Sequence, residues 1–122
     1  MVNNKLTFMK KLILLLLAAI LSCTKHSDSP YANTVYISSW VQHTSLAVKN
    51  NTNSTVDLSN WKLEEVIDGY GYITNTYIIH NKTLAKGESV TYTTADLGFQ
   101  LNYAYTKIYL YDNLGNLKYP KY

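Results

Sequence analysis

The chain has 122 residues, a formal net charge of +3 and no arginine. Three lysines lie within the first eleven residues, and the eight lysines that follow are balanced by eight acidic residues. This balance disfavours nucleic-acid binding through a basic face, because phosphate affinity depends on accumulated positive charge and arginine supplies the bidentate contacts. The length indicates a single domain.

The first 22 residues are typical of an export signal. Lys10 and Lys11 precede the apolar run Leu12 to Leu21, which is about half as long as a membrane-spanning helix. A basic start, a short apolar core and small residues after it are the pattern of a secretory signal peptide. The alternative is a buried helix of the fold, but the run has no polar face. We therefore expect residues 1–22 to be a signal peptide.

The only cysteine, Cys23, follows directly in the sequence AILSC, which resembles the lipobox of bacterial lipoproteins. In that family the thiol carries a diacylglycerol, the preceding peptide is removed and the new N-terminus is acylated. A lone cysteine cannot form an internal disulfide, and several acyl chains on one residue suffice for stable anchoring. The resemblance implies a lipid-anchored membrane protein of the bacterial envelope, on its periplasmic face or cell surface. An unmodified cysteine is the alternative.

The residues after Cys23 divide into a tether and a folded part. Residues 24–34 are polar, contain Pro30 and have no apolar periodicity, which predicts a flexible segment. We therefore expect residues 23–34 to be a lipidated tether and residues 35–122 to be one folded domain, long enough for a modest core.

The folded part alternates apolar and polar residues and has no helical apolar spacing, so we expect strands and no helices. The segment VYISSWV places Val35, Ile37 and Val41 on one face and Trp40 on the other. The same alternation groups further pairs of apolar residues: Leu46 with Val48, Tyr77 with Ile79, Val90 with Tyr92, and Ile108 with Leu110.

Turn residues separate these strands at regular intervals. Residues 50–55 form a polar loop, Asp68-Gly69 predicts a type I′ hairpin turn, and further turns are expected at 86–88 and 112–116. This spacing predicts an all-β fold, a two-sheet sandwich of the immunoglobulin-like kind.

The segment VDLSNWKL breaks the alternation, because the step from Leu58 to Trp61 is three residues. An odd step would turn the later side chains to the wrong face unless a bulge or corner intervenes. We predict a corner at Ser59-Asn60, with a positive φ at Asn60, which tolerates a left-handed backbone. The corner returns Trp61 and Leu63 to the core.

The sequence SLAVKNNTNSTVDLSNWKLEE resembles the lamin tail domain. Members of that family have a strand ending in Asn, a polar loop, Val-Asp-Leu-Ser-Gly-Trp and a Leu two residues later. The matching positions are Asn50, Val56, Asp57, Leu58, Ser59, Trp61 and Leu63, with Asn60 at the frequent Gly. The segments TLAKGESVTY and KIYLYDNLGNLKY also resemble later parts of the family, although Lys86 replaces its Pro. A Glu common in the strand before Asn50 is missing, and residues 99–106 match nothing.

The resemblance implies an immunoglobulin-like sandwich and little about chemistry. Bacterial members are accessory or free-standing domains of exported proteins, with suspected roles in binding or tethering. The animal domains bind proteins and DNA, but the balanced charge of the chain beyond its first eleven residues gives no support for DNA binding.

Few residues suggest catalysis or metal binding. His26, His43 and His80 lack ligand spacing, and a metal site usually needs three or four converging ligands. Asp57 is expected to accept hydrogen bonds from backbone amides at the corner and not to bind calcium. The acidic residues Glu64, Glu65 and Asp68 are expected on a solvated face; the alternative is a carboxylate pair acting on glycosides. A serine–histidine triad is a further alternative, but nothing in the sequence favours it.

Aromatic residues supply the one positive indication of function. GYGY places Tyr70 and Tyr72 at or beside a hairpin tip, and FQLNYAY places Phe99, Tyr103 and Tyr105 in a connecting stretch. Exposed rings with nearby polar groups suit sugar stacking and protein contacts. The alternative is that they cover the outer face of a sheet or pack beneath a loop.

These observations predict a non-catalytic, lipid-anchored module of the bacterial envelope that binds or tethers a protein or glycan partner. We expect no cofactor, no metal and no nucleic-acid partner. The alternatives are a structural envelope component without a discrete ligand and a small hydrolase, which would need a pocket with converging polar groups.

Overall fold

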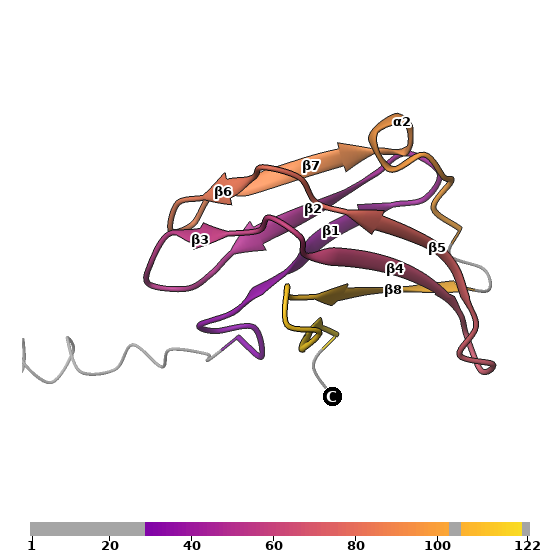
Figure 1. Cartoon of the computed structure of the whole chain (residues 1–122), viewed down its shortest axis with the longest axis horizontal. Coiled ribbons are helices and arrows are strands. Elements are labelled where there is room, and N and C mark those ends of the chain that lie inside the picture. The colour runs from indigo at the N-terminus through magenta and orange to yellow at the C-terminus, as the bar shows by residue number, and fades with distance from the viewer. Residues whose placement is uncertain (1–28, 103–105, 121–122) are drawn as a thin grey trace, which may run out of the picture.

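The computed structural model describes residues 29–102 and 106–120. These residues form nine strands and one helical turn (Figure 1). In chain order, the elements are β1 (Val35–Val41), β2 (Ser45–Asn50), β3 (Val56–Asp57), β4 (Lys62–Ile67), β5 (Ile73–Ile78), β6 (Thr83–Leu84), β7 (Ser89–Thr93), α2 (Thr94–Leu97), β8 (Thr106–Tyr111) and β9 (Leu117–Tyr119). Within these residues, no helix has the length and apolar character needed to cross a membrane.

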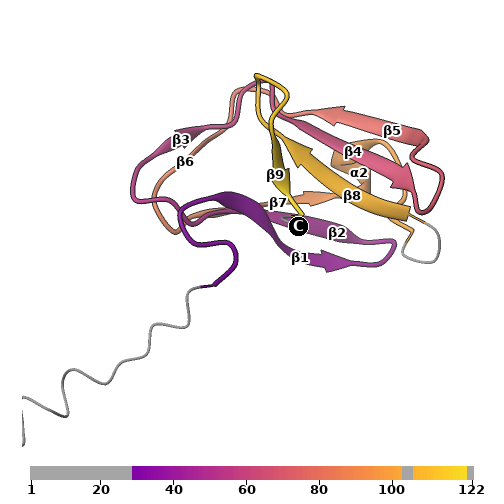
Figure 2. The ribbon, with the colours of Figure 1, turned by 90° about the horizontal axis from the view of Figure 1, so that it is seen from below.

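Two antiparallel sheets face each other across the core. One sheet has the order β1-β2-β7 and the other has the order β5-β4-β8-β9, while β3 and β6 form a short ladder at one end (Figures 1 and 2). Apolar side chains from both sheets, from β6 and from the residue that follows β5 fill the space between the sheets, among them Leu46, Val48, Leu63, Ile79, Leu84, Ile108 and Leu110. The all-β, two-sheet sandwich predicted from the alternation of residues is therefore confirmed.

Strand β1 contains a bulge that was not predicted from the sequence. Its pairing with β2 shifts register between Ile37 and Ser39, and one extra residue reverses the faces of everything that follows. Trp40 consequently packs against the core, whereas Val41 is 52% exposed. The prediction that Val41 shares the inner face with Val35 and Ile37 is wrong for this reason.

The expectation of no helix is wrong at one place, because α2 makes a single turn after β7. Thr93 caps its N-terminus: the Thr93 hydroxyl accepts a hydrogen bond from the Asp96 backbone, and the Asp96 carboxylate accepts from the Thr93 backbone. Gly98 ends the turn with φ 77°. This helix depends on local capping and not on apolar spacing, which is why the periodicity gave no sign of it.

The hairpin between β4 and β5 is wider than a two-residue type I′ turn. Both central residues of such a turn need positive φ, but Gly69 (φ 82°) and Gly71 (φ 69°) are the positive-φ residues of this loop, and Asp68 is not one. The Ile67 carbonyl accepts hydrogen bonds from both Tyr70 N and Gly71 N. The hairpin itself is confirmed, and its turn type is corrected.

The described part of the expected tether, residues 29–34, contacts the sandwich. The ring of Tyr31 stacks on Tyr36 with centroids 4.8 Å apart and lies 5.4 Å from the ring of Tyr119. The Asn51 side chain donates a hydrogen bond of 2.9 Å to the Tyr31 carbonyl. The packed part of the chain thus includes residues ahead of Val35. The expected signal peptide, Cys23 and the rest of the tether lie outside the described residues.

Candidate ligand-binding surfaces

The predicted corner before β4 is present. Asn60 has φ 66°, and its backbone N–H donates to the Ile79 carbonyl at 2.8 Å. Trp61 is 7% exposed, and Leu58 and Leu63 are fully buried. The positive φ at Asn60 and the core position of Trp61 are therefore confirmed, and this segment is structural.

The exposed Asp57 side chain stabilises the corner by accepting hydrogen bonds, as predicted. Its carboxylate accepts a hydrogen bond of 2.6 Å from the Ser59 hydroxyl and one of 2.9 Å from the Ser59 backbone. These two bonds, the hydroxyl first, lower the pKa of Asp57 from its ordinary value. Its role is that of a turn-forming carboxylate.

The two glutamates of β4 are buried, so the expectation of a solvated face is wrong for Glu64 and Glu65, whereas Asp68, which follows β4, is exposed as expected. Glu64 is 7% exposed and Glu65 is 4% exposed. The Glu64 carboxylate forms an ion pair with the Lys62 ammonium, 3.0 Å away. Glu65 accepts hydrogen bonds from Asn75 Nδ2 at 2.7 Å, Thr74 Oγ1 at 2.9 Å and Thr106 Oγ1 at 3.1 Å. Neighbouring donors make their burial possible, because a buried carboxylate needs hydrogen-bonding partners.

The two carboxylates cannot act as a catalytic pair on one substrate. Glu65 is registered opposite Ile108, whose side chain lies in the core, whereas Glu64 is registered opposite Tyr109. Successive side chains of a strand point to opposite faces of the sheet. Glu64 therefore lies on the outer face and Glu65 lies inside, which argues against the glycosidase alternative.

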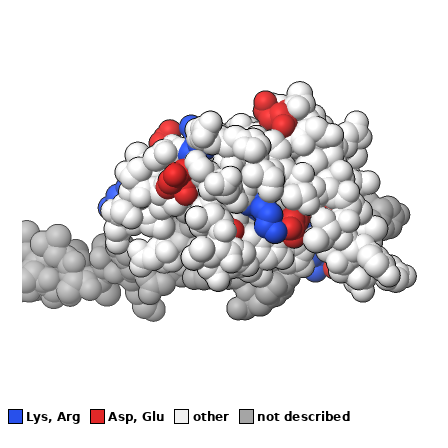
Figure 3. Space-filling view, viewed as in Figure 1, with Lys and Arg blue, Asp and Glu red and all other residues white. Residues whose placement is uncertain are grey.

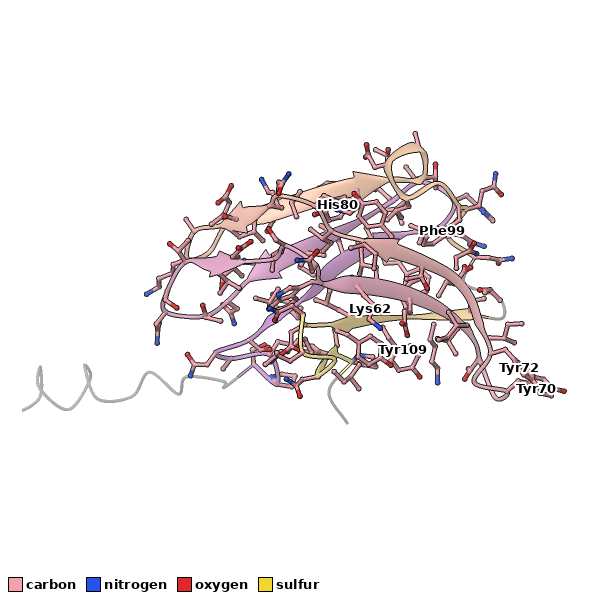
Figure 4. All side chains as sticks on the ribbon, in the orientation of Figure 1. Lys62, Tyr70, Tyr72, His80, Phe99 and Tyr109 are labelled. Carbon is pink, nitrogen blue, oxygen red and sulfur yellow. The ribbon has the colours of Figure 1, made fainter. Side chains whose placement is uncertain are left out.

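Among the residues that the structure describes, the most exposed aromatic side chains occupy the hairpin tip, defined here as residues 68–72. Tyr70 is 77% exposed and Tyr72 is 68% exposed. Their ring centroids are 6.4 Å apart and their planes differ by 18°. Figure 4 shows both rings at the far end of the protruding β4–β5 hairpin, away from the body of the sandwich. The prediction that these two rings lie at a hairpin tip is confirmed.

The other nominated aromatic residues are not joined to the tip by the described structure. Phe99 is partly buried and packs against the core, and Figure 4 places it away from Tyr70 and Tyr72. Tyr103 and Tyr105 lie outside the described residues, as does the nominated lipidation site Cys23.

A second pair of rings, on the outer face of β8, was not nominated from the sequence. The ring centroids of Tyr109 and Tyr111 are 6.3 Å apart with an interplanar angle of 24°. Tyr109 is registered opposite Glu64 and Tyr111 opposite Lys62. We call these four residues the outer-face platform. Alternation along KIYLYD places the two tyrosines on the face opposite Ile108 and Leu110, but the register against β4 cannot be deduced from the sequence.

A mostly apolar groove of about 300 Å³ lies between β1 and the β8–β9 hairpin, lined by Trp40, Lys107, Ile108, Tyr119 and Pro120. The Lys107 ammonium also binds the Asp68 carboxylate at 2.9 Å, so the rim of the groove adjoins the hairpin tip. The bulge in β1 brings Trp40 here, and no sequence signal indicated it.

His43 and His80 are the two histidines within the described residues. His43, with φ 58°, follows β1, and His80 follows β5; both side chains are exposed. Within residues 29–102 and 106–120, no group of three or more His, Cys, Asp or Glu residues is placed to hold a metal ion.

The β8–β9 turn is organised by a carboxylate that sequence analysis did not single out. Burial of Asp112 favours its neutral form, but hydrogen bonds from Asn116, Lys118 and the Leu114 backbone outweigh that effect and lower the pKa of Asp112 to about 2. The Lys118 ammonium lies 3.0 Å from its carboxylate. The role of Asp112 is therefore structural, like that of Asp57.

Comparison with known proteins assigns no family. No protein-family model matches the chain, and no curated protein matches it. The resemblance to the lamin tail domain thus rests on the residues quoted above.

Proposed function

We propose that this chain is a non-catalytic binding or tethering module of the bacterial envelope, held to a membrane by acyl chains on Cys23 and similar in kind to a lamin tail domain. Its partner is a protein or a glycan, and the hairpin tip makes the first contact. The sandwich serves as a rigid mount for the tip.

The exposed, nearly parallel rings of Tyr70 and Tyr72 carry this proposal. Tyrosine supplies a large amphipathic contact area at low conformational-entropy cost, and glycine beside it adapts the backbone, as in the binding loops of antibodies. At the tip, Gly69 and Gly71 precede the two tyrosines directly. Apolar rings that contribute nothing to a core are unfavourable in water, so a partner that covers them gains their burial.

The base of the tip is fixed while its end is free to adapt. The Ile67 backbone N–H donates to the Tyr72 carbonyl at 2.9 Å and closes the loop. The Lys107–Asp68 ion pair adds a contact between the loop and β8, although both groups are half exposed and such pairs contribute about 1 kcal/mol or less. Loops on a rigid scaffold are where binding residues are commonly found.

The test is affinity capture from envelope extracts with the full chain as bait. Tyr70→Ala/Tyr72→Ala should lose the partners that wild type retains, because both rings are removed. Leu114→Ala is the matched control, since Leu114 is also exposed, at 81%, but lies on the β8–β9 turn. Equal recovery by wild type and the tyrosine variant contradicts the proposal. Failure of wild type to retain any protein or glycan favours a structural component without a discrete ligand.

The anchor is tested separately with a radiolabelled or clickable fatty acid. Wild type should incorporate the label and partition with membranes, whereas Cys23→Ala should do neither. Undiminished labelling of Cys23→Ala rules out the anchor without touching the binding proposal.

A further inference from the structure

The two long sides of the sandwich differ in how their edge strands are protected. On one side, β1 carries the bulge, and β9, which lies beside it, has only three residues. The ring of Tyr31 lies against Tyr36 of β1 and Tyr119 of β9, so the segment ahead of β1 bridges both edges. Bulges, short strands and covering segments are devices by which proteins block further strand pairing. This side is therefore protected.

On the other side, β5 is the outer strand of the larger sheet and β7 is an outer strand of the smaller sheet (Figure 2). The β7 edge ends at a negative charge, because the Asp96 carboxylate accepts a hydrogen bond of 2.7 Å from Thr93 N. The β5 edge is disturbed only at its start, and from Asn75 to Ile78 its pairing with β4 is regular. Its sequence, ITNTYI, has no charged residue, proline or glycine. Uncharged edges rich in β-branched residues pair readily with other strands.

The backbone of β5 presents open hydrogen-bonding groups at Thr76 and Ile78. Ile79 N donates to the Trp61 carbonyl at 2.9 Å, and in an antiparallel ladder hydrogen-bonded pairs alternate with pairs that are not bonded. Tyr77 therefore bonds to β4, whereas the N–H and C=O groups of Thr76 and Ile78 point away from it. Among the residues that the structure describes, no other segment supplies these groups with a backbone partner.

We propose that the β5 edge is a dimer contact, at which β5 of a second copy of this chain pairs antiparallel across a two-fold axis at Tyr77. In this register, Thr76 N–H donates to the Ile78 carbonyl of the second copy, and Ile78 N–H donates to the Thr76 carbonyl of the second copy. The two larger sheets then continue as one sheet. This contact is separate from the hairpin tip and does not depend on the proposed function.

The open groups specify a β-strand as the occupant. Outward N–H and C=O groups recur at every second residue of an edge strand, and another extended strand offers its own groups at the same spacing. A helix cannot supply them, because its backbone groups are already bonded within the helix. The edge therefore selects an extended polypeptide.

Symmetry and charge favour a second copy as the source of that strand. Thr76 and Ile78 lie one residue on either side of Tyr77, so a two-fold axis at Tyr77 pairs each of them with the other. Tyr77 then lies opposite Tyr77 of the second copy, a favourable aromatic cross-strand pair, with the ring of Tyr92 5.3 Å away in each copy. Like charges placed opposite each other would oppose such pairing. Over the part of the face where Figure 1 places β5, Figure 3 shows only uncharged side chains.

The experiment is sedimentation equilibrium of the full chain in density-matched detergent. Protein concentrations from about 5 µM to about 1 mM are needed, because a short ladder buries little surface and makes a weak dimer. Wild type should shift from monomer to dimer over this range. Thr76→Pro should weaken the dimer about tenfold or more, because proline lacks the outward N–H. The variant should stay folded, since proline is tolerated where an edge N–H faces solvent.

Thr91→Pro is the matched control. Thr91 is exposed like Thr76, and Thr94 N donates to the Thr44 carbonyl, so the same alternation turns the Thr91 N–H to the open edge of β7. This variant should dimerise like wild type.

Amide exchange of wild type, followed by NMR at low and high concentration, needs no variant and stays decisive if Thr76→Pro unfolds. The amides of Thr76 and Ile78 should exchange fast in the monomer and about tenfold more slowly, or slower still, in the dimer. Exchange of the Thr91 amide should not change with concentration.

Four results overturn the inference. The first is a wild type that stays monomeric at every concentration, which leaves capture through the hairpin tip unaffected. The second is a dimer that folded Thr76→Pro retains, or one that leaves the Thr76 and Ile78 amides unprotected. The third is a dimer lost in Tyr70→Ala/Tyr72→Ala and kept in Thr76→Pro, which places the contact at the tip. The fourth is protection of the β5 amides by a captured protein but not by concentration, which gives the edge to another chain.

Discussion

Two turns at opposite ends of β4 use the same backbone device with opposite results. At the corner, Asn60 adopts φ 66° directly before Trp61; at the hairpin tip, Gly69 and Gly71 adopt φ 82° and 69° directly before two tyrosines. The ring after Asn60 is buried, and the rings after the glycines are the most exposed aromatics among the described residues.

The difference lies in where the backbone hydrogen bonds of each turn go. The corner bonds to distant segments: Leu58 N donates to the Lys82 carbonyl, and Ile79 N donates to the Trp61 carbonyl. The backbone hydrogen bonds of the tip are local: Tyr70 N and Gly71 N donate to the Ile67 carbonyl, and Ile67 N donates to the Tyr72 carbonyl. A residue with a left-handed backbone conformation thus sets the direction of the ring that follows it. Backbone hydrogen bonds to distant segments decide whether that ring enters the core. The ring at the corner is part of the core, and the rings at the tip are exposed to solvent.

The largest effect should come from removing the corner ring. Trp61→Ala should lower the free energy of unfolding by about 3–5 kcal/mol, because a large buried aromatic side chain is lost and leaves a cavity. That is comparable with the whole stability of a small domain, so the variant should be unfolded or barely folded. Urea denaturation monitored by circular dichroism measures this loss of stability. A denaturation curve like that of wild type would contradict the assignment of Trp61 to the core and so the difference between the two turns.

Trp61 could be predicted from sequence because the odd step is visible on both sides of it. Val56 and Leu58 are two residues apart, and so are Trp61 and Leu63. The step between the two pairs, from Leu58 to Trp61, is three residues, which does not fit a continuous strand. The bulge in β1 gives no such sign: Val41 is apolar, so the alternation looks unbroken although Trp40 faces the core.

The candidate surfaces were only partly predictable from the sequence for a related reason. Tyr70 and Tyr72 could be placed at a tip from local turn residues alone. The outer-face platform needs the register between β4 and β8, which pairs Lys62 with Tyr111 and Glu64 with Tyr109, residues far apart in the sequence. The burial of Glu65 likewise depends on Thr106, which is distant in sequence. Long-range pairing of this kind leaves no local pattern.

A third turn, between β8 and β9, should behave like the corner but respond to acid. Asp112→Ala should destabilise by about 1–3 kcal/mol at neutral pH, since hydrogen bonds to a charged group are lost. The folded pKa of about 2 is below the ordinary value of 3.8, so this stabilisation is present above pH 3.8 and disappears as the pH falls to about 2. Melting temperatures of both proteins from pH 7 to 2 should converge; a constant gap would contradict the assignment.

The backbone of the corner should show a smaller effect. Asn60→Val should cost about 1–2 kcal/mol, because a β-branched residue resists positive φ. Asn60→Gly is the matched control and should be within about 0.5 kcal/mol of wild type, because glycine adopts positive φ without strain. Urea denaturation distinguishes the two, and equal loss in both variants would mean that the Asn60 side chain, and not its backbone, supports the corner.

The smallest effect on stability belongs to the tip. Tyr70→Ala/Tyr72→Ala should change the free energy of unfolding by less than about 0.5 kcal/mol, as expected for exposed side chains outside the core. A loss of several kcal/mol, in the same urea experiment, would assign these rings to the fold and remove the reason to expect a partner there.

Amide hydrogen exchange on the full chain, alone and with the partner recovered by capture, compares both turns in one measurement. The amides of Leu58, Asn60 and Ile79 should exchange only through global unfolding, those of Tyr70 and Gly71 should exchange far faster, and the partner should slow exchange at the tip. Corner amides that exchange as fast as the tip, or a tip whose exchange the partner leaves unchanged, would contradict the separation of a structural corner from a binding hairpin.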